Sequence, residues 1–142
     1  MLWCAQVQSW EGCVESHDVI RGTAAEANAS QTDGWVVGHF MPPGLGQRKD
    51  VEVKLWHYDV QPHYPVKVFG GTEFIVIYRG QIRIDIVLPD GKEESCVLNG
   101  DRQDFVIFPP GTKKKVTTEA VPAFGVTVRW PSAPELNQVI EA

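Results

Sequence analysis

The sequence lacks any apolar run approaching the length of about 20 residues that a membrane-spanning helix needs. Its N-terminal stretch contains no basic residue followed by an apolar segment, so the pattern of a secretion signal is missing as well. These two absences predict a cytoplasmic protein that has no membrane partner.

Basic residues are scarce, with 13 Lys and Arg against 18 Asp and Glu and a formal net charge of −5. A nucleic-acid binder needs a basic face that displaces the counterions of the phosphates. The one basic run, Lys113–Lys115, is too short to supply such a face. The charge balance therefore predicts no nucleic-acid partner.

Cysteine is rare, and the three cysteines (Cys4, Cys13 and Cys96) have no close metal-ligand spacing. Cys4 and Cys13 would be able to form a disulfide, whereas unpaired thiols suit a reducing compartment. No histidine stands with a serine or cysteine in a recognised nucleophile motif, so the sequence does not predict a hydrolase triad.

Sustained helical periodicity is missing too, except over Pro134–Glu141, where one short helix is predicted. Apolar segments that end in glycine or proline turns recur about every eight to twelve residues, which is typical of a β-sandwich or β-barrel. Phe74–Tyr78 and Gln81–Leu88 are expected to form a hairpin that turns at Gly80. The other predicted strands are 34–40, 51–60, 66–69, 93–98, 105–108, 115–118 and 124–130.

Two motifs resemble those of the cupin superfamily. Six residues separate Glu73 from Gly80, as in the first cupin motif, and Gly100 precedes the corner Pro109–Gly111, as in the second. Three further stretches look like a group of small single-domain bacterial cupins that have no assigned function and a degenerate metal site: Gly38–Gly44, Asp50–His57 and Val126–Pro131.

The resemblance implies an all-β fold, the cupin-type jelly-roll β-barrel (double-stranded β-helix, RmlC-like), with at most short helices at the termini. It covers roughly residues 17–132 as one domain. Residues 1–16 are expected to be an extension that is either an edge strand or disordered, and residues 133–142 to be a tail or a short helix. Because cupin barrels commonly pair, the resemblance also implies a homodimer.

Metal-binding cupins hold a transition metal with a His-x-His pair, the motif glutamate and a later histidine. By the resemblance these positions fall here on Lys67, Phe69, Glu73 and Lys114, so that only the glutamate is retained. Phenylalanine cannot ligate, and a protonated lysine repels a cation. We therefore expect no metal cofactor, and a small polar or anionic molecule bound by Lys67, Glu73, Lys114 and Arg129. The alternative is that both lysines extend to solvent and Glu73 is simply a strand residue.

His57 shares one face of its strand with Val51, Val53 and Leu55, a pattern that would place it in the pocket. There it would act as a general base with Tyr78, as in metal-free sugar-epimerase cupins, or only line the pocket. A second possibility is a rearranged oxygenase metal site made of His57, His63 and Glu73. Arg129 would either clamp a ligand carboxylate or cover Trp130.

Two classes of function remain open from the sequence: a binding protein for a small molecule, and an enzyme of the isomerase, epimerase or oxygenase type. An enzyme is favoured if His57 and Glu73 both point into an open pocket. A structural role is favoured if aromatic side chains fill that pocket, the candidates being Trp35, Phe40, Trp56 and Phe69.

Overall fold

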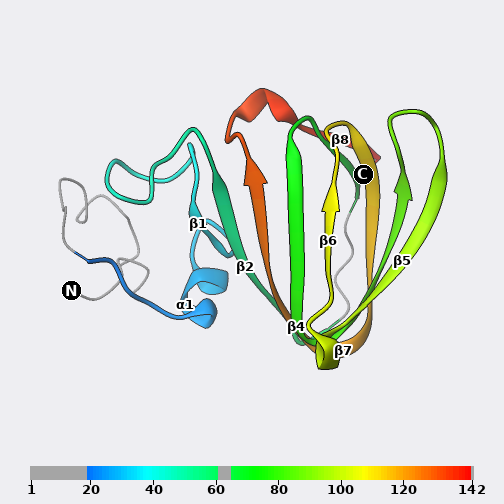
Figure 1. Ribbon diagram of the computed structural model, residues 1–142. Helices are drawn as coiled ribbons and strands as arrows, with labels where there is room; N and C mark the ends of the chain where they lie inside the picture. The colour runs from blue at the N-terminus through cyan, green and yellow to red at the C-terminus, as the bar shows by residue number, and fades with distance from the viewer. Residues whose placement is uncertain (1–18, 61–64, 142) are drawn as a thin grey trace.

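The computed structural model describes residues 19–60 and 65–141, which form a curled antiparallel jelly roll (Figure 1). The all-β class is thereby confirmed. In chain order the elements are α1 (Ala24–Ala29), β1 (Trp35–Val37), β2 (Glu52–Tyr58), β3 (Val66–Phe69), β4 (Thr72–Val87), β5 (Glu93–Asn99), the 3-10 turn η3 (Gly100–Arg102), β6 (Phe105–Phe108), β7 (Thr112–Trp130), the 3-10 turn η4 (Pro134–Leu136) and β8 (Asn137–Glu141).

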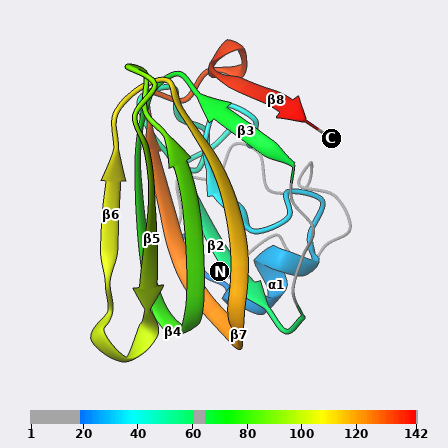
Figure 2. The same ribbon diagram turned by 90° about the vertical axis from the view of Figure 1, so that its right-hand side faces the viewer.

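Two long strands, β4 and β7, run through both layers of the barrel. The first part of β4 pairs with β6 and with the last part of β7, as in the register Glu73↔Arg129. The second part of β4 pairs with β5 and with the first part of β7, as in Ile84↔Val116. One layer therefore has the order β1-β2-β7-β4-β6 and the other the order β8-β3-β7-β4-β5. Figure 2 shows β3 and β8 side by side at the edge of the second layer.

The hairpin predicted at Gly80 is wrong, because β4 continues through this residue. Its register against β7 shifts between Ile77 and Ile82, where the strand passes from one layer to the other. Gly80 has φ of +83°, and a Cβ atom there would lie 2.5 Å from the carbonyl oxygen of Ala120 and 2.6 Å from that of Pro122. The glycine that suggested a turn instead lets two bent strands approach closely.

The C-terminal helix predicted over Pro134–Glu141 is also wrong, since only the turn η4 forms and β8 follows it. β8 pairs with β3 in the register Phe69↔Asn137 and satisfies the backbone groups of that edge strand. Residues 137–141 are therefore part of the second layer. One helix that the sequence did not indicate, α1, begins after Thr23, whose hydroxyl oxygen accepts a hydrogen bond from the Glu26 amide.

Apolar side chains fill the space between the layers beside the β4 bend. Ile77, Ile82 and Ile84 are almost completely buried, and Trp56, Leu98 and Phe108 join the same cluster. Among the described residues, no helix is long and apolar enough to cross a bilayer. The predictions for residues 1–16, for the Cys4–Cys13 pair and for His63 lie outside the described residues.

Candidate functional site

A cavity of about 110 Å³ lies between the two layers. Its walls combine apolar and aromatic side chains with a group of charged ones. The lining residues are Trp35, Lys54, Trp56, Tyr58, Pro65, Lys67, Glu73, Ile75, Ile82, Lys114, Val116, Thr127 and Arg129. Trp35 and Trp56 line the cavity without filling it, so it remains available to a ligand.

Four of the residues that the sequence singled out come together here, since Lys67, Glu73, Lys114 and Arg129 all line the cavity. They come from three strands. Lys67 of β3 lies directly opposite Lys114 of β7, and Glu73 of β4 lies opposite Arg129 of β7. The inward direction expected for both lysines is thus observed, although Lys67 is exposed and lies at the rim.

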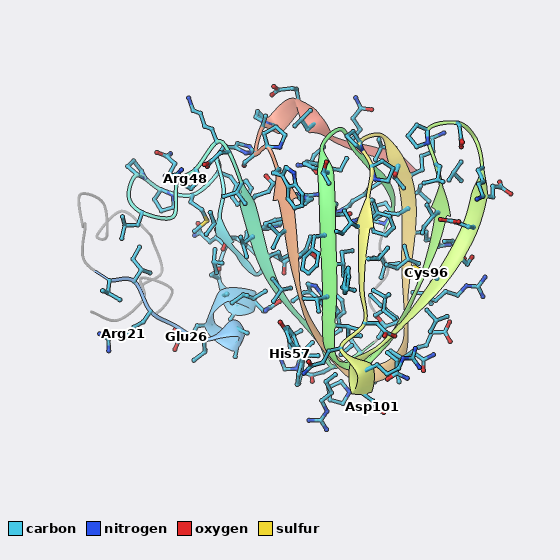
Figure 3. The ribbon with its side chains drawn as sticks, in the orientation of Figure 1. Arg21, Glu26, Arg48, His57, Cys96 and Asp101 are labelled. Atoms are coloured by element: carbon cyan, nitrogen blue, oxygen red, sulfur yellow. The ribbon has the colours of Figure 1, made fainter. Side chains whose placement is uncertain are left out.

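His57 is not among the cavity-lining residues, and the expectation that its strand face points inward is wrong. The inward face of β2 carries Lys54, Trp56 and Tyr58, whereas His57 projects from the opposite face and contacts the Asp59 carboxylate at 2.9 Å. Its ring packs edge-on against Phe124, and Figure 3 shows it at the lower end of the sheet. The apolar face of β2 therefore points outward, and its charged and aromatic face lines the cavity.

Tyr78 likewise lies outside the cavity, on the outer face of β4, with 53% of its surface exposed. Alternation along β4 places Glu73, Ile75 and Ile77 inside, so Tyr78 must point away from them. Neither residue of the predicted acid–base pair therefore reaches the space where a ligand would sit.

Glu73 and Lys114 form a buried ion pair that joins the two layers across the cavity. Their side chains are only 4% and 14% exposed. Burial lowers the pKa of the Lys114 ammonium well below its ordinary value, and the positive charges of Arg129, Lys67 and Lys54 lower it further. Burial among these cations thus disfavours the charged form of Lys114.

Arg129 is held on several sides. Its Nη2 lies 2.6 Å from Oε1 of Glu52, and its Nη1 lies 3.8 Å from Oε2 of Glu73. The rings of Trp35 and Phe69 lie on the guanidinium, each with its centroid 4.5 Å away. Burial lowers the pKa of Arg129, while the neighbouring Glu52 carboxylate acts in the opposite direction. Arg129 is a fixed cation in the cavity wall, and it does not cover Trp130.

Glu52 is a functional residue that the sequence did not reveal. It is completely buried, and the Ser132 hydroxyl donates a hydrogen bond of 2.8 Å to its Oε2. Because that hydroxyl has only one proton, His39 must donate to Ser132, through its amide at 2.9 Å and through Nδ1 at 2.7 Å. A chain of contacts thus leads from His39 through Ser132 and Glu52 to Arg129.

Lys54 is the other cavity residue that was missed. Its side chain is 15% exposed and lies 3.8 Å from the Asp33 carboxylate at the surface. Burial lowers its pKa, and the charges of Lys67 and Arg129 act in the same direction, whereas Asp33 opposes them. Glu52, Lys54 and Trp56 share one strand face, and this spacing is the sequence signal for Lys54. The sequence instead predicts that the other face, which is apolar, points inward.

The donor atoms of this cavity do not fit a transition metal. Its charged lining consists of four cationic side chains and the carboxylate of Glu73, which is already paired with Lys114. Across the part of the chain that the structure describes, no three His, Cys, Asp or Glu residues are grouped as metal ligands. Of the alternative metal set, His57 and Glu73 lie apart from each other.

The lowered pKa of Lys114 predicts that stability rises with pH. Between the lowered pKa of the folded state and the ordinary lysine pKa, the unfolded chain binds a proton at Lys114 that the folded chain does not. The free energy of unfolding therefore increases with pH across this interval. We expect Lys114→Met to remove that increase, which urea unfolding from neutral to alkaline pH will measure. If the free energy of unfolding changes with pH in the same way in the wild type and in Lys114→Met, the prediction is wrong.

The fold is similar to that of known cupins. Oxalate decarboxylase from Bacillus subtilis, solved at pH 4.6, matches with a TM-score of 0.57 at 13% sequence identity, over 65% of this chain and 24% of that one. A structure on the substrate binding mode and a reaction specificity switch of oxalate decarboxylase matches with a TM-score of 0.55 at 14% identity, over the same shares. No protein-family model and no curated protein matches the sequence.

The chain thus spans 24% of the length of these neighbours. At such low identity the likeness concerns the fold alone, and it confirms the cupin-type jelly roll that the two motifs implied.

Proposed function

We propose that this protein binds a small organic anion in the cavity between its layers, without a metal ion. The observation that carries the proposal is the charge of the lining. Lys54, Lys67, Lys114 and Arg129 face the cavity, and Glu73 is the only carboxylate among the described lining residues.

Counting Glu52 behind Arg129 still leaves more positive than negative charge around the cavity. Water is partly excluded there, so the cations repel one another more strongly than they would in bulk solvent. Burial lowers the pKa values of Lys54 and Lys114, and the neighbouring cations lower them further, although Asp33 opposes the shift at Lys54. A bound anion would offset the repulsion, which makes anion binding favourable.

The size of the cavity restricts the ligand. Its volume of about 110 Å³ is space for on the order of ten water-sized groups. The aromatic walls formed by Trp35, Trp56 and Tyr58 suit the carbon part of a ligand, while the cations suit its carboxylate. A carboxylic acid of a few carbon atoms meets both conditions. The structural neighbours named above are oxalate decarboxylases, so oxalate belongs among the probes.

Isothermal titration calorimetry with acetate, oxalate, succinate and inorganic phosphate tests the proposal. We expect at least one carboxylate to bind. Lys54→Met is expected to weaken that binding by about tenfold or more, because a hydrogen bond to a charged group contributes about 1.5–3 kcal/mol. Lys113→Met is the matched control, since Lys113 is exposed and does not line the cavity.

Two results would contradict anion binding: no heat of binding with any of the four probes, or equal weakening by Lys54→Met and Lys113→Met. An enzyme that uses His57 and Tyr78 is the less favoured alternative, because both side chains lie outside the cavity. The homodimer stays a prediction, and exposed Phe105 and Ile107 on the outer face of β6 are consistent with it.

A further inference from the structure

We propose that Lys114 forms a reversible imine with a small oxo acid, whose carboxylate is held by Arg129 and Lys54. The proposal rests on the proposed function and narrows it, because it names a carbonyl group next to the carboxylate as the feature that the cavity selects.

The first argument is the position of the amine. Lys114 extends from β7 of one layer to Glu73 on the other, and its side chain is largely buried in the cavity wall. A buried lysine among other cations is the environment in which lysine amines act as nucleophiles, because the ammonium form is disfavoured there. The lowered pKa of Lys114 agrees with this environment.

The second argument is the buried carboxylate beside the amine. Glu73 is buried and contacts Lys114 directly. The Asp33 carboxylate, which lies 3.8 Å from Lys54, is by contrast exposed. Lys67 is exposed at the rim. Imine formation needs proton transfers at the reacting atoms, and Glu73 is placed to make them.

The steps balance without any oxidant or reductant. Glu73 accepts a proton from the Lys114 ammonium, and the free amine then attacks the carbonyl carbon, so that a C–N bond forms and the carbonyl π bond breaks. The nitrogen then gives a proton to the oxygen, and a carbinolamine results. The hydroxyl group accepts the proton held by Glu73 and leaves as water, while the nitrogen gives its last proton to the Glu73 carboxylate. The net change is the loss of one water molecule.

The third argument is the distance between the cations and the amine. In a 2-oxo acid the carboxylate is bonded directly to the carbonyl carbon, so the group that binds the carboxylate must be close to Lys114. Arg129 satisfies this condition, because its Nη1 lies 3.8 Å from the same Glu73 carboxylate that contacts Lys114. An acid of two or three carbon atoms fits this short separation.

Reductive trapping tests the proposal. The full-length protein is incubated with glyoxylate and sodium borohydride at neutral pH, and the modified lysine is identified by peptide mass spectrometry as carboxymethyl-lysine. We expect Lys114 to be labelled at least about tenfold faster than any other lysine, because Glu73 contacts its amine and a positioned acid–base group accelerates such a step by about 10²–10⁴-fold. Lys113→Arg should retain the label, and Lys114→Arg should lose it.

The rate of trapping in Glu73→Gln is a second test, because a purely structural role of Glu73 would leave this rate unchanged in a folded variant. We expect it to slow trapping at Lys114 by about 100-fold, as the loss of a general acid–base group does. Circular dichroism melting curves of each variant establish that it is folded. Equal labelling of many lysines, an unchanged yield in Lys114→Arg, or unchanged trapping in folded Glu73→Gln would overturn the proposal.

Calorimetry with lactate, which has a hydroxyl in place of the carbonyl of pyruvate, separates the two proposals. If lactate and pyruvate both bind but borohydride traps nothing on Lys114, the imine is wrong and anion binding stands. If neither acid nor any of the four earlier probes binds and nothing is trapped, both are wrong.

Discussion

Replacement of Arg129 by methionine is expected to lower the free energy of unfolding by about 3–5 kcal/mol, the typical cost of leaving a buried charge without its partner. Glu52 is 0% exposed, and Arg129 is its ion-pair partner at 2.6 Å. Without the guanidinium, the Ser132 hydroxyl is the one hydrogen-bond donor that the described residues leave to that carboxylate. Urea unfolding followed by tryptophan fluorescence measures the change.

Two controls accompany this variant. The double change Glu52→Gln with Arg129→Met removes both charges and should recover most of the lost stability. Arg48→Met breaks the ion pair with Asp50, in which both side chains are more than half exposed, and should lower the free energy of unfolding far less than Arg129→Met does. If Arg129→Met and Arg48→Met lower the free energy of unfolding equally, burial of the Glu52–Arg129 pair does not contribute to stability.

Gly80→Ala is expected to destabilise the protein by about 2–5 kcal/mol, which combines the left-handed conformation with overlap in a packed region. The added Cβ would lie 2.5 Å and 2.6 Å from the carbonyl oxygens of Ala120 and Pro122. Thermal and urea unfolding of the variant measure the loss.

Gly91→Ala is the matched control. Gly91 has nearly the same backbone angle, with φ of +89° against +83°, but nothing lies within 4 Å of a Cβ added there. It should therefore cost only the conformational penalty of about 1–2 kcal/mol. If the two substitutions cost the same, the close approach of β4 and β7 at Gly80 is not a constraint on the fold.

Short strands bounded by turn residues were predicted well. Val66–Phe69 and Phe105–Phe108 were predicted with the bounds that the structure has. Their limits are set locally, by glycine and proline, which the sequence displays directly. The β4 bend was not predicted, because a glycine between two alternating segments fits a hairpin equally well. The pairing of both segments with distant β7 decides between the two.

The sequence predicts only part of the candidate site, because some of its contacts join residues that are distant in the sequence. Glu73 and Lys114 were found through the motif spacing, which fixes where they lie in the barrel. The sequence predicts a wrong position for His57, because the apolar face of β2 points outward. The inner face of β2 presents charged and aromatic residues to the cavity. Glu52 was missed because its partners Ser132 and Arg129 are remote in sequence.

The passage of β4 and β7 through both layers restricts how a ligand gains access to the interior. Since each of these strands is one covalent chain in both layers, the barrel has no hinge along which its walls could separate as two halves. Lys67 lines the cavity and is exposed, so we expect a ligand to enter past its side chain.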